Sequence, residues 1–225
     1  ILVRGPALTR SGYGEHTRLI LRALKHREDL FDIYLVPVNW GKTGWIYEDT
    51  EERRWLDLII TKTAIYQQQN QPQYDISMQV TIPNEWEKMA PINIGVTAGI
   101  ETTRVSPLWI EKGNFVDKII TISEFSKNTY SGTNYTITNN KTGQVVEENY
   151  RCTTPIEVVN YPVRQTEIQK IDLDLTTDFN FLVAAQWSPR KNLENTIGWF
   201  VEEFIDQEVG LILKINVVNN SLIDC

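Results

Sequence analysis

Residues 179–218 constrain the fold most, because their hydrophobic pattern changes from that of a strand to that of a helix and back. A β-rich run begins at Phe179, apolar residues then recur at helical spacing up to Phe204, and a second β-rich run covers residues 210–218. Parallel strands joined by a helix are the basic unit of α/β proteins. The stretch therefore predicts a strand–helix–strand unit.

A polar loop joins the first of these strands to the helix and carries Arg190 and Lys191. Ser188 and Pro189 supply the cap and first-turn signals of the helix. Exposed N–H groups and the helix dipole already favour an anion at a helix start. Two cations are unfavourable there unless an anion lies opposite, so the loop predicts an anion site, and a solvated loop is the alternative. Lys214, in the second strand, is expected near the same strand edge unless it is merely exposed.

The rest of the chain shows the same alternation of β-rich and helical stretches. The predicted strands cover residues 1–3, 31–38, 76–80, 92–97, 118–122 and 157–163, and the predicted helices cover residues 15–25, 51–64 and 124–130. In the second of these helices, Trp55, Leu58 and Ile59 are expected to face inward. This order predicts an α/β fold with a parallel sheet and helices on both faces.

Polar segments divide this pattern into two predicted domains. Residues 131–151 are rich in Asn, Thr, Gly and Tyr and lack apolar periodicity, which predicts an inserted loop or hairpin. The first domain covers residues 1–164, and residues 165–225 hold a charged connector and an incomplete second domain. Because the chain starts without Met and ends soon after a predicted strand, we expect a fragment or a processed product.

Composition disfavours several classes of function. The 225 residues carry a net charge of −7, which argues against nucleic-acid binding through a broad basic surface. No apolar run approaches the ~20 residues that span a bilayer, and the chain start lacks signal-peptide character, so we expect a cytoplasmic protein without a transmembrane segment. Two cysteines are too few for a disulfide framework or a thiolate metal site.

The loop after the first predicted strand holds candidate binding residues. Gly12, Tyr13 and Gly14 precede a helix, and glycine lets the backbone approach a phosphate or a sugar. A bare turn explains the same residues. His16, in the first helical turn, is a candidate donor to ligand oxygens, with a solvated or capping histidine as the alternative.

A second candidate loop follows the predicted strand 92–97. It contains Glu101, near the strand end where open α/β sheets bind ligands. A surface ion pair with Arg104 is the alternative role for this acid. Thr97 and Thr102 are candidates to supply hydroxyl groups, or else are turn residues.

Sequence motifs of several enzyme classes are absent. The chain has no Gly-x-x-x-x-Gly-Lys-Ser/Thr loop, no Gly-x-Ser-x-Gly elbow and no His-Glu-x-x-His motif, which disfavours ATPases, serine hydrolases and zinc enzymes. Residues 5–14 do not fit the Gly-x-Gly-x-x-Gly fingerprint, which disfavours a nucleotide-sugar epimerase or dehydrogenase.

Together these segments resemble the retaining glycosyltransferases of family four, which have the GT-B architecture of two Rossmann-like domains facing a cleft. The resemblance spans most of the chain. It is carried by the glycine loop at residues 12–14, the block at 99–125 with its acid-containing loop, the stretch 159–163, and the loop 185–192.

The resemblance implies transfer of a sugar from a nucleotide-sugar donor to a glycan, lipid or small-molecule acceptor, with retention of configuration and without a bound metal or cofactor. Lys191 falls on the family's phosphate-binding lysine, and Arg190, Lys214, Gly12 and Gly14 are assigned to the same donor-phosphate site. A catalytic role goes to Glu101. Four residues are assigned to the acceptor side of the cleft: Tyr13, His16, Thr97 and Thr102.

The chain departs from the family pattern at two positions of the phosphate loop. Gln186 stands where the family usually has an arginine, and Asn192 stands where a glycine usually follows the lysine. The family's acidic pair that contacts the donor sugar is expected beyond Cys225, so this chain alone is expected to be inactive. The second hypothesis is a non-catalytic sugar- or nucleotide-binding module of the same fold.

Overall fold

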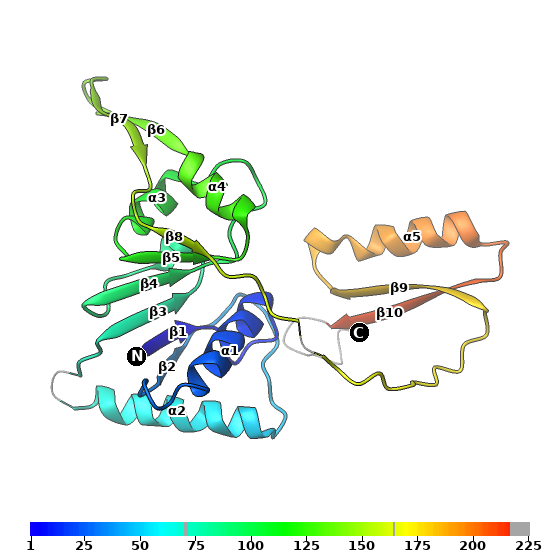
Figure 1. Ribbon diagram of the computed structural model, residues 1–225. Helices are drawn as coiled ribbons and strands as arrows, with labels where there is room; N and C mark the ends of the chain where they lie inside the picture. The colour runs from blue at the N-terminus through cyan, green and yellow to red at the C-terminus, as the bar shows by residue number, and fades with distance from the viewer. Residues whose placement is uncertain (70–71, 164, 217–225) are drawn as a thin grey trace. The chain divides into compact units, whose positions relative to one another are not determined.

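The computed structural model describes residues 1–69, 72–163 and 165–216 (Figure 1). The last two residues of the final predicted strand, and Cys225, lie outside these ranges. The chain forms two compact units, and we describe each by itself. The first unit comprises residues 1–40 and 46–162, and the second comprises residues 41–45 and 163–225. The sequence prediction put the boundary at residue 164, and this division falls after Pro162.

The first unit is built on a six-stranded parallel sheet, which confirms the α/β prediction (Figure 1). Its strands are β1 (Leu2–Gly5), β2 (Tyr34–Pro37), β3 (Ile76–Val80), β4 (Ile92–Val96), β5 (Lys118–Thr121) and β8 (Ile156–Val158). They lie in the order β2-β1-β3-β4-β5-β8, and every neighbouring pair is parallel. The order reverses at β1, and open α/β sheets bind ligands at the carboxyl ends of the strands near such a reversal.

Helices cover both faces of this sheet. They are α1 (Gly12–Lys25), α2 (Glu51–Gln67), α3 (Pro107–Gly113) and α4 (Glu124–Gly132), together with the 3-10 helix η1 (Pro83–Glu85). One buried cluster includes Leu21 of α1 and Leu56 of α2, and a second includes Trp86. The adjacent β5 residues Ile119 and Ile120 belong to different clusters. Because neighbouring strand residues point to opposite faces, the two clusters lie on opposite sides of the sheet.

The first helix begins at Gly12, whereas the sequence predicted a glycine loop up to residue 14. The Ser11 hydroxyl accepts a hydrogen bond from the Gly14 N–H at 2.9 Å and so caps the helix. Gly12 and Gly14 are therefore in the first turn of α1. A Cβ atom at residue 14 would clash with the backbone oxygen of Thr9, so Gly14 permits close packing of the chain on itself.

Two further differences concern helices. Leu58 was predicted to face inward and is 69% exposed, because α2 turns Leu56 toward the sheet in its place, together with Ile59, which was predicted correctly. Helix α3 was not predicted at all. It begins where the Ser106 hydroxyl accepts from the Leu108 N–H, directly before a proline.

The polar insertion forms an antiparallel hairpin of β6 (Asn134–Thr138) and β7 (Val145–Arg151), one of the two forms predicted for it. The strand predicted at 157–163 is shorter than expected. Strand β8 ends at Val158, and residues 159–163 continue without regular structure. This irregular segment carries a tyrosine into the site described below.

The second unit contains the predicted strand–helix–strand arrangement. Its elements are β9 (Phe179–Gln186), the 3-10 helix η2 (Pro189–Lys191), α5 (Leu193–Phe204) and β10 (Val209–Asn216). Strands β9 and β10 are parallel, with Phe179 opposite Val209. The helix begins at Leu193 rather than at Pro189, because Asn192 takes a left-handed conformation (φ 51°) that ends η2.

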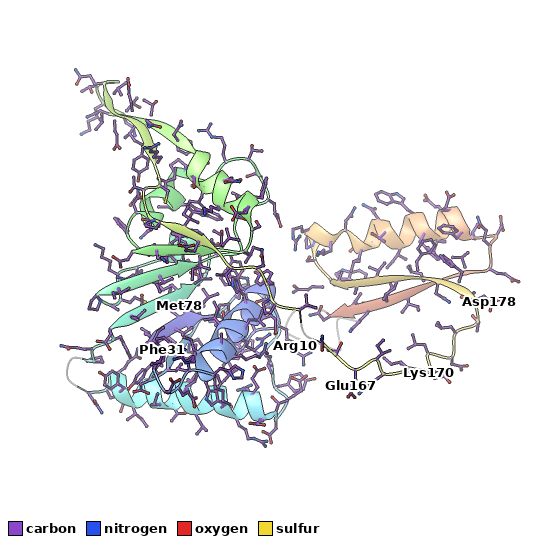
Figure 2. All side chains as sticks on the ribbon, viewed as in Figure 1. Arg10, Phe31, Met78, Glu167, Lys170 and Asp178 are labelled. Carbon is purple, nitrogen blue, oxygen red and sulfur yellow. The ribbon has the colours of Figure 1, made fainter. Side chains whose placement is uncertain are left out.

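The connector at residues 165–178 contains neither helix nor strand. Figure 2 shows Glu167 and Lys170 along this connector. It also shows Phe31 and Met78 in the first unit, where both pack against the first buried cluster. Among the described residues, no helix has the length and apolar character needed to cross a bilayer.

Candidate functional site

A cavity of about 570 Å³ opens in the first unit where the parallel strands end. Its lining comes from the segments that follow five of the strands: Tyr13 after β1, Ile82 after β3, Ala98–Glu101 after β4, Ile122, Ser123, Phe125 and Ser126 after β5, and Tyr161 after β8, with Trp109 from α3. This is the edge where open α/β sheets bind ligands. We therefore take this cavity as the first candidate site.

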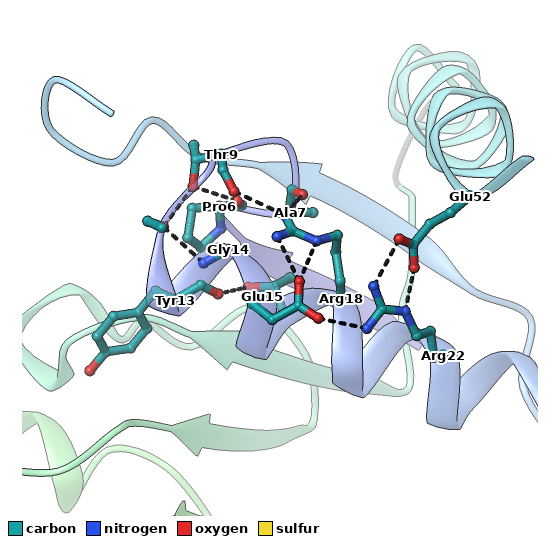
Figure 3. A network of polar contacts seen from close by, with 11 residues as sticks. Pro6, Ala7, Thr9, Tyr13, Gly14, Glu15, Arg18, Arg22 and Glu52 are labelled. Carbon is teal, nitrogen blue, oxygen red and sulfur yellow. Dashed lines mark hydrogen bonds and ion pairs between the residues drawn. The ribbon is translucent and has the colours of Figure 1, made fainter. Parts of the chain in front are cut away.

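The segment between β1 and α1 is held in place by a buried arginine (Figure 3). The Arg18 guanidinium donates to the backbone oxygens of Ala7 at 2.7 Å and Thr9 at 2.9 Å, and it pairs with Glu15 at 2.8 Å. Glu15 also pairs with Arg22 at 2.8 Å. The network uses the carbonyl groups of the segment before α1 and so fixes the entry to that helix, whose first turn carries Tyr13.

Tyr13 extends from this turn to the end of β4. Its hydroxyl is 2.9 Å from the Thr97 hydroxyl and accepts a hydrogen bond from the Ala98 N–H at 3.2 Å. Its ring packs against Trp40 with centroids 4.5 Å apart. Burial raises the pKa of Tyr13, so the phenol stays protonated near neutral pH. Tyr13 thus lines the cavity, and the fully buried Thr97 positions it from behind.

The loop after β4 approaches the start of α4 closely. Gly99 has φ +84°, and a Cβ atom there would clash with the Ser126 side chain, so this position requires glycine. The loop brings Glu101 to the cavity as its one carboxylate among the described lining residues. Glu101 is solvent-exposed and forms no ion pair with Arg104, which instead donates to the Asn134 oxygen at 2.6 Å.

Tyr161 reaches the cavity from the irregular segment after β8, with His16 behind it. The Tyr161 hydroxyl lies 3.3 Å from His16 Nδ1, and the two rings meet edge to face with centroids 4.7 Å apart. His16 is only 6% exposed, and burial lowers its pKa to about 4. His16 is therefore neutral at pH 7 and contacts a cavity residue rather than lining the cavity.

The starts of the four α-helices described in the first unit are closed by side chains. Each N-cap accepts a hydrogen bond from a first-turn N–H group, and the four caps are Ser11, Thr50, Ser106 and Ser123. In α1 and α4, the two long helices next to the cavity, the first turn also holds an acid, Glu15 or Glu124. A carboxylate there already interacts with the positive end of the helix dipole.

The helix start of the second unit is different, and it forms the second candidate site. Arg190 and Lys191 lie in η2, directly before α5, and both are exposed. Within the described residues, no side chain caps α5 at Asn192, and neither cation forms an ion pair. Glu194 is the one acid in the first turn. The open N-terminus and two cations against one carboxylate favour an anion.

The remaining predicted residues take other places. Thr102 is exposed, bonds to the Arg104 backbone oxygen at 3.1 Å and does not line the cavity. Gly12 is exposed on α1, in the first unit. Lys214 lies exposed on β10 opposite Ala184, two residues before the last pair of the β9–β10 ladder.

Sequence reasoning missed Tyr161, Trp109 and Phe125 as cavity residues. Tyr161 lay inside a segment predicted as strand, and Trp109 lay in a helix that was not predicted. A usable signal was present for Phe125 and Tyr161, because both follow closely in sequence on the carboxyl end of a strand. An aromatic side chain near such an end is a candidate for the binding edge.

In the described part of the chain, no group of three or more His, Cys, Asp or Glu residues is placed to hold a metal ion. Comparison with models of known protein families, with curated proteins and with solved structures finds no match to this chain. The function is therefore argued from the two sites and from the resemblance in sequence.

Proposed function

We propose that this protein is a retaining GT-B glycosyltransferase that transfers a sugar from a nucleotide-sugar donor to a hydroxyl group of an acceptor. The observation that carries this proposal is the open start of α5, preceded by Arg190 and Lys191. A strand, a short cationic turn and an uncapped helix are a suitable binding site for the diphosphate of such a donor.

The chemistry requires stabilisation of a leaving group. The bond between the sugar C1 and the phosphate oxygen breaks, and a bond from C1 to the acceptor oxygen forms. The acceptor hydroxyl passes its proton to the departing phosphate oxygen, and a nucleoside diphosphate leaves. Arg190 and Lys191 would stabilise the negative charge that develops on the diphosphate. Asn192 supports this role, because its left-handed conformation is one that glycine and asparagine both adopt readily, so the departure from the family glycine preserves the turn.

The cavity of the first unit is the proposed acceptor site. Glu101 is the residue we assign to the acceptor hydroxyl, because its carboxylate is the strongest hydrogen-bond acceptor among the described cavity residues. A non-catalytic sugar-binding module is the second candidate function. It is favoured by the fact that this cavity is formed entirely within one unit.

The test is release of nucleoside diphosphate from UDP-, GDP- and ADP-sugars. It is measured with a version of the protein that includes the acidic pair expected from the resemblance, and with a mixture of glycan and small-molecule acceptors. We expect Lys191→Ala to lower turnover about tenfold or more, because it removes a cation from the leaving group. Lys170→Ala, on the exposed connector, is the matched control and should have no effect. Equal turnover by the Lys191 variant removes that residue from the donor site, and absence of turnover with every donor favours the binding module.

A further inference from the structure

Three aromatic rings of the cavity are each supported by a second ring. Tyr13 packs on Trp40 and Tyr161 packs on His16, with the centroid distances given above. Trp109 stacks on the fully buried Tyr130, with centroids 6.2 Å apart and planes 21° apart. Rings held from behind lose little conformational entropy when a ligand covers them.

Polar residues line the cavity together with these rings. They are Ser123 and Ser126, whose hydroxyls are 3.0 Å apart, and Glu101. A lining of aromatic rings with hydroxyl-bearing and carboxylate side chains suits a ring that has apolar C–H faces and a rim of hydroxyl groups. A carbohydrate ring has this character.

The charge of the cavity is the decisive feature. None of its described lining residues is lysine, arginine or histidine, and Glu101 is its one charged side chain at neutral pH. Serine side chains cap the α-helices that begin beside the cavity, namely Ser11 in α1, Ser106 in α3 and Ser123 in α4, and the first turns of α1 and α4 each hold a glutamate. A bound phosphate would thus meet a carboxylate without a compensating cation.

We propose that this cavity takes an uncharged, hydroxyl-rich sugar ring, stacked on Tyr161 and Trp109, and that it rejects phosphorylated sugars. The role of this ring as the acceptor of a transfer reaction rests on the proposed function. Its binding does not, because every residue that lines the cavity belongs to the first unit. The inference therefore commits the site to neutral acceptors such as glycan ends and polyols, and excludes sugar phosphates.

The test is donor-free binding of matched sugar pairs to the whole chain. The probes are glucose, mannose and trehalose, each against its 6-phosphate, with saturation-transfer NMR and tryptophan fluorescence as readouts. We expect at least one neutral sugar to bind with a Kd in the millimolar range, about tenfold or more tighter than its phosphate. Glu101→Gln should reduce the difference in affinity between the neutral sugar and its phosphate, because it removes the charge that repels the phosphate.

Tyr161→Ala should weaken binding of the neutral sugar about fivefold or more, because it removes a stacking ring. Tyr161→Phe keeps the ring and should retain most of the affinity, which separates stacking from misfolding. Tyr47→Ala is the matched control, since Tyr47 is 72% exposed and does not line the cavity.

Three results would overturn the proposal: tighter binding of the phosphates, neutral-sugar binding that Tyr161→Ala leaves unchanged, or no binding of any neutral probe up to about 100 mM. These outcomes are distinct from failure of the proposed function. Sugar binding without nucleotide-sugar turnover leaves this inference standing and removes the transferase, whereas turnover with a phosphorylated acceptor does the reverse.

Discussion

The helix starts of the two units differ, and each start indicates the charge of the ligand beside it. In the described part of the first unit, serine or threonine side chains cap all four α-helices, and glutamates occupy the first turns of α1 and α4. In the second unit, Asn192 leaves α5 uncapped behind Arg190 and Lys191. The same strand–turn–helix arrangement thus presents a closed, acidic end in one unit and an open, cationic end in the other.

The comparison shows that a helix N-terminus is not by itself an anion site. Its N–H groups and dipole favour an anion only when neighbouring side chains leave them available. Ser123 makes its cap bond to the Ser126 N–H at 3.1 Å, so α4 has already used part of that capacity. We therefore assign the neutral ligand to the first unit and the diphosphate to the second.

The largest expected effect breaks the closed turn of the first unit. Arg18→Ala removes a buried guanidinium. The backbone oxygens of Ala7 and Thr9 then lose the hydrogen bonds that Arg18 donates to them. We expect a loss of about 4 kcal/mol in local stability. Hydrogen exchange of the β1 and α1 amides measures it. Arg27→Ala, which removes an exposed pair with Asp29, should cost less than about 0.5 kcal/mol, and equal losses would refute the role of Arg18.

Acid should weaken the first unit through His16. Its folded pKa of about 4 lies below the unfolded value of 6.5, so the unfolded chain takes up the proton first. Stability is complete above pH 6.5 and falls as the pH drops from 6.5 to 4, by about 3 kcal/mol in total. Unfolding free energies of the protein and of His16→Gln, measured across this range, isolate the effect. The His26→Gln variant is the control, and its unfolding free energy should depend on pH as that of the unchanged protein does. If the His16→Gln variant also followed that curve, His16 would not be the group responsible.

Opening one closed helix start should have a moderate effect. Ser123→Ala removes the cap of α4 and should lower the stability of that helix by about 1 kcal/mol. Hydrogen exchange in α4 measures the change. Ser131→Ala, near the other end of the same helix, is the control, and the cap is unimportant if both variants exchange alike.

Adding an acid to the open helix start should have the smallest effect on stability. Asn192→Asp places a carboxylate at the start of α5, and we expect about 0.5 kcal/mol of added stability from the helix dipole. The same charge should weaken binding of nucleoside diphosphates, which calorimetric titration with UDP, GDP and ADP measures. Asn140→Asp, in the exposed hairpin turn, should change neither quantity. Unchanged or tighter diphosphate binding by the Asn192 variant would remove the contrast between the units.

Much of the fold could be predicted because the strands of the first sheet are short runs rich in β-favouring residues. Residues 76–80, for example, alternate apolar residues with Ser77 and Gln79, were predicted as a strand and form β3. Glu101 could be identified as a cavity residue because strand ends define the binding edge. The exposure of Leu58 could not be predicted, because the sequence does not show which apolar side of α2 packs against the sheet. Tyr161 was missed because residues 157–163 were predicted as strand, whereas β8 ends at Val158 and Tyr161 follows that strand end.

Hydrophobic periodicity along the sequence determined the α/β class and the order of most strands and helices. The sequence also determined the cationic turn, through the residues Arg190 and Lys191. These are local properties of the chain. Only the tertiary structure decided which helix starts are closed and which residues meet at the cavity. Whether a helix start is capped depends on the backbone angles of a single residue, as the left-handed conformation of Asn192 shows. Tyr13 and Tyr161 line the same cavity although they lie near opposite ends of the sequence of the first unit. Packing brings them together, and no pattern along the chain shows this.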